Sequence, residues 1–204
     1  MPIQLPIQWN QDTFNHLLKA AAVIGDDTLM TTLIDNGADI ETKIDKEATP
    51  LILAAENGNT ACVIALLNKK ADIEARDNDG CTALMHAAAN EHPGCVEALI
   101  NAGADIEAKD KNHATALTYA ASHGHAECVN ALLKAGADIE AEDKNHATAL
   151  TYAASRGHAA CVDLLSEEQR TRSEIQQLAD NNLEKIEYLK QHPMKFNRLF
   201  KKTD

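Results

Sequence analysis

Hydroxyl and imidazole side chains gather in one stretch, DKNHATALTYAAS, which occurs at residues 110–122 and again at residues 143–155. A serine or threonine beside a histidine suits nucleophilic catalysis, in which the imidazole takes the hydroxyl proton. Histidines and cysteines that converge on one point would instead bind zinc. Either chemistry needs the reactive atoms to meet in space, so the spacing of these residues decides whether it is available.

Four of the five cysteines follow one another at intervals of 33 residues, at Cys62, Cys95, Cys128 and Cys161. Such regular spacing places the four cysteines at equivalent positions of successive helices. Packed helices lie about 8–10 Å apart, whereas the Cα atoms of a disulfide lie within about 7 Å. We therefore expect these four to be small buried residues, without disulfides or a metal ion. The fifth, Cys81, falls in a predicted turn and is expected to be an exposed thiol.

The histidines form two similar columns, at His92, His125 and His158 and at His113 and His146. Zinc needs several ligands about 2.0–2.1 Å from one ion, and side chains spaced by a whole repeat do not converge. The sequence also lacks G-x-S-x-G, H-E-x-x-H and a phosphate-binding glycine loop. It therefore predicts no catalytic residues, no metal, no cofactor and no enzyme activity.

A 33-residue repeat explains this regular spacing. The tripeptide A-D-I begins at Ala38, Ala71, Ala104 and Ala137, and T-x-L begins at Thr49, Thr82, Thr115 and Thr148. Two independent markers with one period indicate stacked units, each too small to bury its apolar face alone.

Each unit has the pattern of two short helices. The threonine suits a helix N-cap, and Pro50 suits the first helical position. We expect the first helix to end near a left-handed glycine, at Gly58, Gly124 or Gly157. A second helix, such as residues 60–68, follows and ends before the A-D-I loop, at Gly37, Gly103 or Gly136.

This unit resembles the ankyrin repeat. The similar stretches are TPLILAAENGN, TALMHAAANEH, TALTYAASHGH, TALTYAASRGH and the later ALLNKKADIEA, ALINAGADIEA and ALLKAGADIEA. The resemblance implies an all-α solenoid of stacked helix–turn–helix units with short β-turn loops and a C-terminal capping helix. We predict an arm at residues 1–11, units at 12–43, 44–76, 77–109, 110–142 and 143–165, and a helical cap with a basic tail at 166–204. The first unit lacks T-P-L and is expected to be an atypical N-terminal cap.

Some positions depart from the family's glycine pattern. Glu47, His113 and His146 replace the glycine before the threonine, Glu91 replaces a helix-ending glycine, and Lys70 replaces the glycine of GADI. We expect strained left-handed turns at these sites and an intact fold.

Glutamates also recur, directly after A-D-I, at Glu41, Glu74, Glu107 and Glu140. We interpret this column mainly as a solubility device. Steering of a basic partner is the alternative.

The resemblance implies that a partner contacts the turn tips and the ends of the first helices. Carried over to this sequence, the candidates are Lys46, Leu53, Glu56, Asn57, Asn78, Asp79, His86, Asn90, Lys111, Asn112, Tyr119, Ser122, His123, Lys144, Asn145, Tyr152, Ser155 and Arg156. Tyrosine is a frequent hot-spot residue. We predict that Tyr119→Ala with Tyr152→Ala abolishes partner binding without lowering helicity.

The repeat pattern stops after Leu165. Residues 173–191 predict one helix with Ser173 as its N-cap and Pro193 beyond its end. Its apolar face would consist of Ile175, Leu178, Ile186 and Leu189. The following MKFNRLFKK is basic and amphipathic. We expect a cap on the last repeat, and keep a docking peptide, a membrane-surface segment and a translocation signal as alternatives.

The 204-residue chain contains 3% aromatic residues and carries a formal net charge of −12. It therefore lacks the positive field that binding to nucleic acid or anionic membranes requires. No secretory signal or transmembrane segment is predicted. An odd number of cysteines without C-x-x-C favours a reducing compartment. We expect a cytoplasmic monomer.

The function implied is non-enzymatic binding of a protein partner, as an adaptor, scaffold or inhibitor, with a basic partner surface as one option. The alternative is a host-directed effector of an intracellular bacterium, delivered into the host cytosol with the C-terminal tail as its translocation or docking signal.

Overall fold

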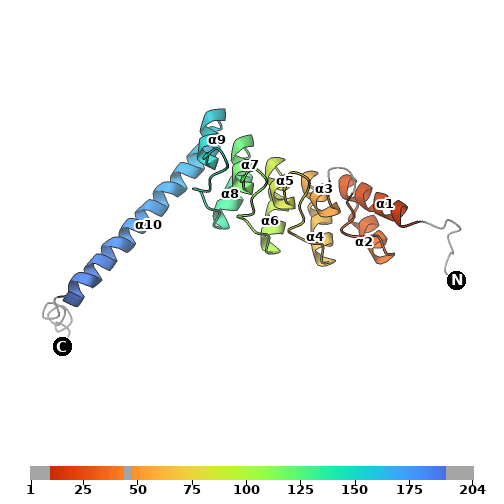
Figure 1. Ribbon diagram of the computed structural model, residues 1–204, viewed down its shortest axis with the longest axis horizontal. Helices are drawn as coiled ribbons and strands as arrows, with labels where there is room; N and C mark the ends of the chain where they lie inside the picture. Colours follow the sequence, from red (N-terminus) through yellow and green to blue (C-terminus); the bar gives the residue numbers. More distant parts are fainter. Residues whose placement is uncertain (1–9, 44–46, 192–204) are drawn as a thin grey trace. The chain divides into compact units, whose positions relative to one another are not determined.

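The structure is a computed structural model that describes residues 10–43 and 47–191. These residues form ten helices in consecutive pairs (Figure 1). The helices are α1 (Gln11–Ile24), α2 (Asp27–Asp35), α3 (Pro50–Glu56), α4 (Thr60–Asn68), α5 (Ala83–Ala89), α6 (Pro93–Asn101), α7 (Ala116–His123), α8 (Ala126–Lys134), α9 (Ala149–Arg156) and α10 (Ala159–Gln191).

The repeats stack as two layers of helices (Figure 1). The first helices α1, α3, α5, α7 and α9 contact one another in sequence, and so do the second helices α2, α4, α6 and α8. Within a repeat the two helices pack side by side, as α3 does on α4. The predicted all-α solenoid of helix–turn–helix units is confirmed.

The repeated threonines begin the first helices as predicted. The Thr49 hydroxyl accepts from the backbone N–H of Ile52 at 3.4 Å, and Pro50 occupies the first helical position. Thr82, Thr115 and Thr148 cap α5, α7 and α9 in the same way. Each cap satisfies an N–H that the helix itself leaves unbonded.

The left-handed turns are kept where glycine is replaced. Positive φ angles occur at Glu47 (58°), Lys70 (70°), Glu91 (61°), His113 (65°) and His146 (59°). A side chain in this region costs roughly 1–2 kcal/mol relative to glycine. The fold therefore tolerates the strain at these positions without changing the turn, as expected.

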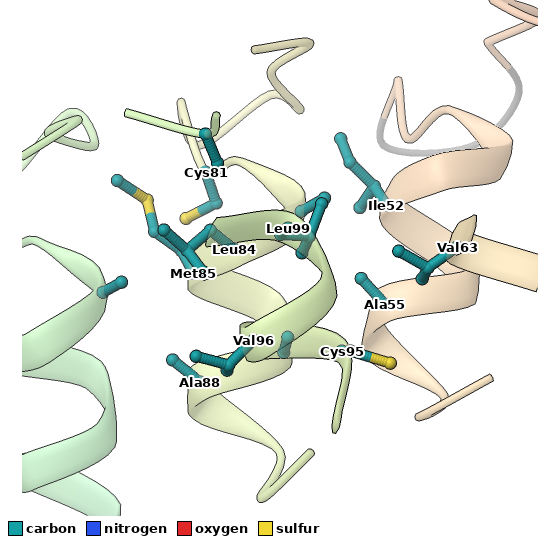
Figure 2. Close-up of a cluster of buried hydrophobic side chains, with 14 of the residues drawn as sticks. Ile52, Ala55, Val63, Cys81, Leu84, Met85, Ala88, Cys95, Val96 and Leu99 are labelled. Carbon is teal, nitrogen blue, oxygen red and sulfur yellow. The ribbon is translucent and has the colours of Figure 1, made fainter. Parts of the chain in front are cut away.

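Small and branched apolar side chains fill the space between the layers. Figure 2 shows Leu84, Met85 and Ala88 of α5 next to Val96 and Leu99 of α6. All five are at most 2% exposed.

The cysteine column lies in this core. Cys62, Cys95, Cys128 and Cys161 are fully buried and form no disulfide. Burial raises the pKa of Cys62 and of Cys128 to about 11. A thiol at that pKa is protonated at neutral pH, so these residues act as small apolar side chains.

The chain divides into two compact units, residues 1–165 and 166–204. The prediction that a new helix begins at Ser173 is wrong, because α10 begins at Ala159 and is continuous through this position. No glycine or proline interrupts residues 159–191. The Ser173 hydroxyl instead donates to the Gln169 carbonyl at 2.8 Å, a bond that lets serine sit inside a helix.

In the second unit, Ile175 and Leu178 are more than 60% exposed. The side chains of Ile186 and Leu189, Pro193 and the segment MKFNRLFKK lie outside the described residues. The capping role of this unit stays a prediction.

Candidate functional site

The turn tips form a row that is tied together by backbone hydrogen bonds. The Lys111 N–H donates to the Asp79 carbonyl at 3.0 Å, and the Lys144 N–H donates to the Asn112 carbonyl at 2.9 Å. Beneath the tips, the Arg76 guanidinium donates to the Lys109 carbonyl at 2.6 Å. The backbone of each tip is therefore fixed relative to the next.

An aspartate in each of the last three turns holds the tip from below. Asp110 Oδ1 accepts from the backbone N–H groups of Asn112 at 2.8 Å and Ala114 at 2.7 Å. Asp143 makes the equivalent two bonds, with Asn145 and Ala147. This arrangement closes the turn with a side chain in place of a backbone carbonyl.

The second oxygen of each aspartate binds the first helix of the same repeat. The Tyr119 hydroxyl donates to Asp110 Oδ2 at 2.9 Å. The Tyr152 hydroxyl donates to Asp143 Oδ2 at 2.6 Å, and this bond is the main cause that lowers the pKa of Asp143. Both tyrosines are half-buried. Their hydroxyls therefore join the turn to the first helix. The sequence predicts these tyrosines as partner contacts and does not predict this structural role.

The repeat at residues 77–109 has a histidine at the tyrosine position. His86 Nε2 lies 2.8 Å from Asp77 Oδ2. Burial acts to raise the pKa of Asp77, but the bonds from His86 and from the backbone of Cys81 and Asp79 outweigh it and lower this pKa.

Cys81 was expected to be an exposed thiol, and this prediction is wrong. Its side chain packs into the core cluster and is 7% exposed, with Sγ 3.3 Å from the Tyr119 hydroxyl. Burial raises the pKa of Cys81 to about 11. Asp77, Cys81 and His86 bring one donor atom each within 4.8 Å of one another. Searching for columns 33 residues apart missed this group, because its members belong to one repeat.

The histidines at the starts of the second helices join adjacent repeats. His92 Nε2 donates to the Glu56 carbonyl at 3.1 Å, and His125 Nε2 donates to the Ala89 carbonyl at 3.0 Å. His158 makes the same bond to the Ser122 carbonyl. The His92 ring packs closely on Gly58, where a Cβ would lie 2.6 Å from Nδ1 and would require the ring to shift.

The glutamate column has a similar role, which neither sequence interpretation foresaw. Glu74 Oε1 accepts from the backbone N–H of Asp105 in the next repeat at 2.8 Å. Glu41 binds the N–H of Asp72, and Glu107 binds that of Asp138. These carboxylates connect repeats, in addition to any effect on solubility.

The serine that ends the first copy of the opening stretch and the histidine that directly follows it do come close, yet their arrangement does not suit catalysis. Ser122 Oγ lies 3.0 Å from His123 Nδ1. Both atoms also lie 3.0 Å from the Tyr119 carbonyl, which can only accept. When Nδ1 donates to that carbonyl it has no lone pair to take the serine proton.

A family model described as ankyrin repeats (3 copies) matches residues 17–110 and again residues 96–177. The chain belongs to the ankyrin-repeat family. Ankyrin repeats are generally protein–protein interaction modules without enzyme activity. No curated protein matches this sequence. Across residues 10–43 and 47–191, no helix of this ankyrin protein is long and apolar enough to cross a membrane.

The predicted partner-binding residues of this ankyrin protein differ in how exposed they are. The exposed ones are Glu56, Asn57, Asn78, Asp79, Asn90, Lys111, Asn112, His123, Lys144, Asn145, Ser155 and Arg156. The half-buried ones are Leu53, His86, Tyr119 and Tyr152. Lys46 lies outside the described residues.

Ser122 does not belong to the ankyrin surface. It is 7% exposed and its hydroxyl donates to the Tyr119 carbonyl, so a partner could not contact it as predicted. At the same position one repeat later, Ser155 is exposed. Arg156 lies over the Tyr152 ring, with its guanidinium carbon 5.8 Å from the ring centre.

Proposed function

We propose that this ankyrin protein is a non-enzymatic binding module, an adaptor, scaffold or inhibitor, whose protein partner contacts the turn tips and the exposed ends of the first helices. The observation that carries the proposal is the row of tips at residues 78–79, 111–112 and 144–145. Its backbone is fixed from repeat to repeat while its side chains are exposed.

A fixed backbone favours binding because little conformational entropy is lost when the partner docks. The aspartates beneath the tips, together with the histidines and glutamates that join adjacent repeats, supply this rigidity. The tip side chains carry both signs of charge, with Asp79 in one tip and Lys111 and Lys144 in the next two. The net charge of −12 favours a partner that presents basic groups around these contacts.

The test is affinity capture from a cytosolic extract with the tagged full-length protein. The double variant Lys111→Glu with Lys144→Glu reverses charge in the row of tips. Its matched control is Lys134→Glu, an exposed charge reversal on the second-helix layer, in α8. We expect the wild type and Lys134→Glu to retain the same proteins and the tip variant to lose them.

Two outcomes would contradict the proposal. In one, the wild type retains nothing beyond what the tag alone retains. In the other, the tip variant and Lys134→Glu lose the partner equally. The lysine variants separate binding from folding better than alanine at Tyr119 and Tyr152, because each tyrosine also joins a turn to a helix.

The finer biological setting is part of the same proposal. We propose a cytoplasmic monomer, since a reducing compartment suits five unpaired cysteines. Delivery into a host cell, with the C-terminal segment as signal, is the alternative. Full-length reporter fusions with and without residues 192–204 distinguish these settings, because only a translocated effector loses secretion when that segment is removed.

A further inference from the structure

We propose that Asp77, Cys81 and His86 form a binding site for one divalent transition-metal ion, with Zn²⁺ as the best-suited ion. Their carboxylate, thiol and imidazole donor atoms all lie within 4.8 Å of one another. Zinc commonly takes this mixture of oxygen, sulfur and nitrogen ligands. The inference concerns the interior of one repeat and is independent of the proposed partner surface.

The repeats of the chain provide an internal comparison for this site. At the three equivalent positions the next repeat has Asp110, Ala114 and Tyr119, and the following one has Asp143, Ala147 and Tyr152. Those repeats close the turn with a tyrosine–aspartate hydrogen bond, and the alanine at the Cys81 position offers no side-chain atom that could bind a metal. Only the repeat at residues 77–109 replaces both the alanine and the tyrosine with residues that can bind metal, and both replacements face the same aspartate.

The geometry is close to that of a metal site without an ion. Two backbone N–H groups hold Asp77 Oδ1, from Asp79 at 2.9 Å and Cys81 at 2.8 Å. They leave Oδ2 facing His86 Nε2 at 2.8 Å. With zinc bonds of about 2.0–2.3 Å, tetrahedral ligand atoms lie about 3.3–3.7 Å apart. An ion therefore enters when the imidazole and carboxylate separate by roughly half an ångström.

Burial and charge also favour a cation here. The side chain of Asp77 is 8% exposed and that of His86 is 21% exposed, so the ion enters from the histidine side. The Tyr119 hydroxyl, 3.3 Å from Cys81 Sγ, binds the Asp110 carboxylate at 2.9 Å, so a second carboxylate lies close to the group. Negative charge around the group favours a divalent cation.

Binding can be written with balanced charges and protons. The S–H bond of Cys81 breaks, its proton goes to solvent, and a sulfur–metal bond forms. In the metal-free site the His86 imidazole donates its Nε2 proton to Asp77 Oδ2. On metal binding this proton passes to solvent and Nδ1 holds a proton, so the Nε2 lone pair is free to coordinate. Three protein ligands leave a fourth position for water. The Tyr119 hydroxyl, 3.3 Å from Cys81 Sγ, is placed to hydrogen-bond and orient the sulfur ligand.

Titration of the full-length protein with Co²⁺ tests the site, because cobalt bound to thiolate gives a charge-transfer band that cobalt bound to oxygen or nitrogen does not. We expect one equivalent of Co²⁺, a thiolate band, and displacement by Zn²⁺. Cys81→Ala should abolish the band, and His86→Tyr should weaken cobalt binding at least about tenfold. Both substitutions restore residues that the neighbouring repeats carry, so circular dichroism should show a folded protein.

His123→Ala is the control for adventitious binding by surface imidazoles, because the exposed His123 ring stacks on His125 with centroids 5.8 Å apart. It should leave the cobalt band unchanged. The proposal is overturned if the folded wild type binds no stoichiometric Co²⁺. It is also overturned if the thiolate band survives in Cys81→Ala, or if His123→Ala removes it.

Discussion

The turn tips and the polar residues that join adjacent repeats recur with the same period, yet they have different roles. Lys111 and Lys144 at the tips are exposed, with backbones fixed by their neighbours. The side chains of His125 and Glu107, by contrast, lie between repeats and hydrogen-bond the backbone of an adjacent repeat. A polar residue that recurs in a repeat protein can therefore belong to the frame, and periodicity alone does not identify the binding surface.

The largest expected effect separates the core from the tips. Leu99 is fully buried between the helix layers, so Leu99→Ala should lower the free energy of unfolding by about 2–5 kcal/mol. Lys144→Ala at a tip should change it by less than about 0.5 kcal/mol. Urea denaturation measures both. Equal losses would show that the tips are part of the stabilising frame.

The second prediction contrasts two histidines. His92→Ala removes the bond to the Glu56 carbonyl and the ring that packs on Gly58, and should cost about 1–3 kcal/mol. His123→Ala removes an exposed ring and should cost less than about 0.5 kcal/mol. Thermal or urea unfolding of the two variants measures these costs. A larger loss of stability in His123→Ala than in His92→Ala would contradict the view that His92 joins the repeats and His123 does not.

The third prediction concerns two equivalent left-handed positions, Lys70 and Gly103. Lys70→Gly should stabilise the protein by about 1 kcal/mol, because glycine adopts the φ of 70° without strain. Gly103→Ala should destabilise it by a similar amount. Nothing lies within 4 Å of a Cβ there, so only backbone strain acts. Unfolding energies that move in the same direction would exclude strain as the cause.

The smallest effect tests the glutamate column. Glu74→Ala should cost about 0.5–1 kcal/mol, because the Asp105 N–H loses its acceptor. Glu74→Gln keeps an amide oxygen in place and should retain most of that stability. If glutamine and alanine destabilise the protein equally in urea, the carboxylate contributes through charge and not through this bond.

Much of the frame follows from local patterns. Thr49 and Pro50 could be placed at a helix start because capping depends on a few neighbouring backbone groups. The left-handed turns at Lys70 and Glu91 followed from their alignment with glycines in other repeats.

The failures have physical causes. Cys81 lies in a turn, but the next repeat covers it, with Tyr119 against its sulfur. Ser173 resembles an N-cap, yet helical residues precede it without a break, so its hydroxyl bonds backwards to Gln169. The bonds of Glu74 to the following repeat depend on how repeats are stacked, which sequence spacing does not specify.

The most direct test of the account measures stability and binding on the same variant. For Lys111→Glu with Lys144→Glu, we predict an unfolding free energy within about 0.5 kcal/mol of the wild type and loss of the captured partner. Retained binding by this variant, or lost binding accompanied by a large loss of stability, would contradict the claim that a rigid frame presents the tips to a protein partner.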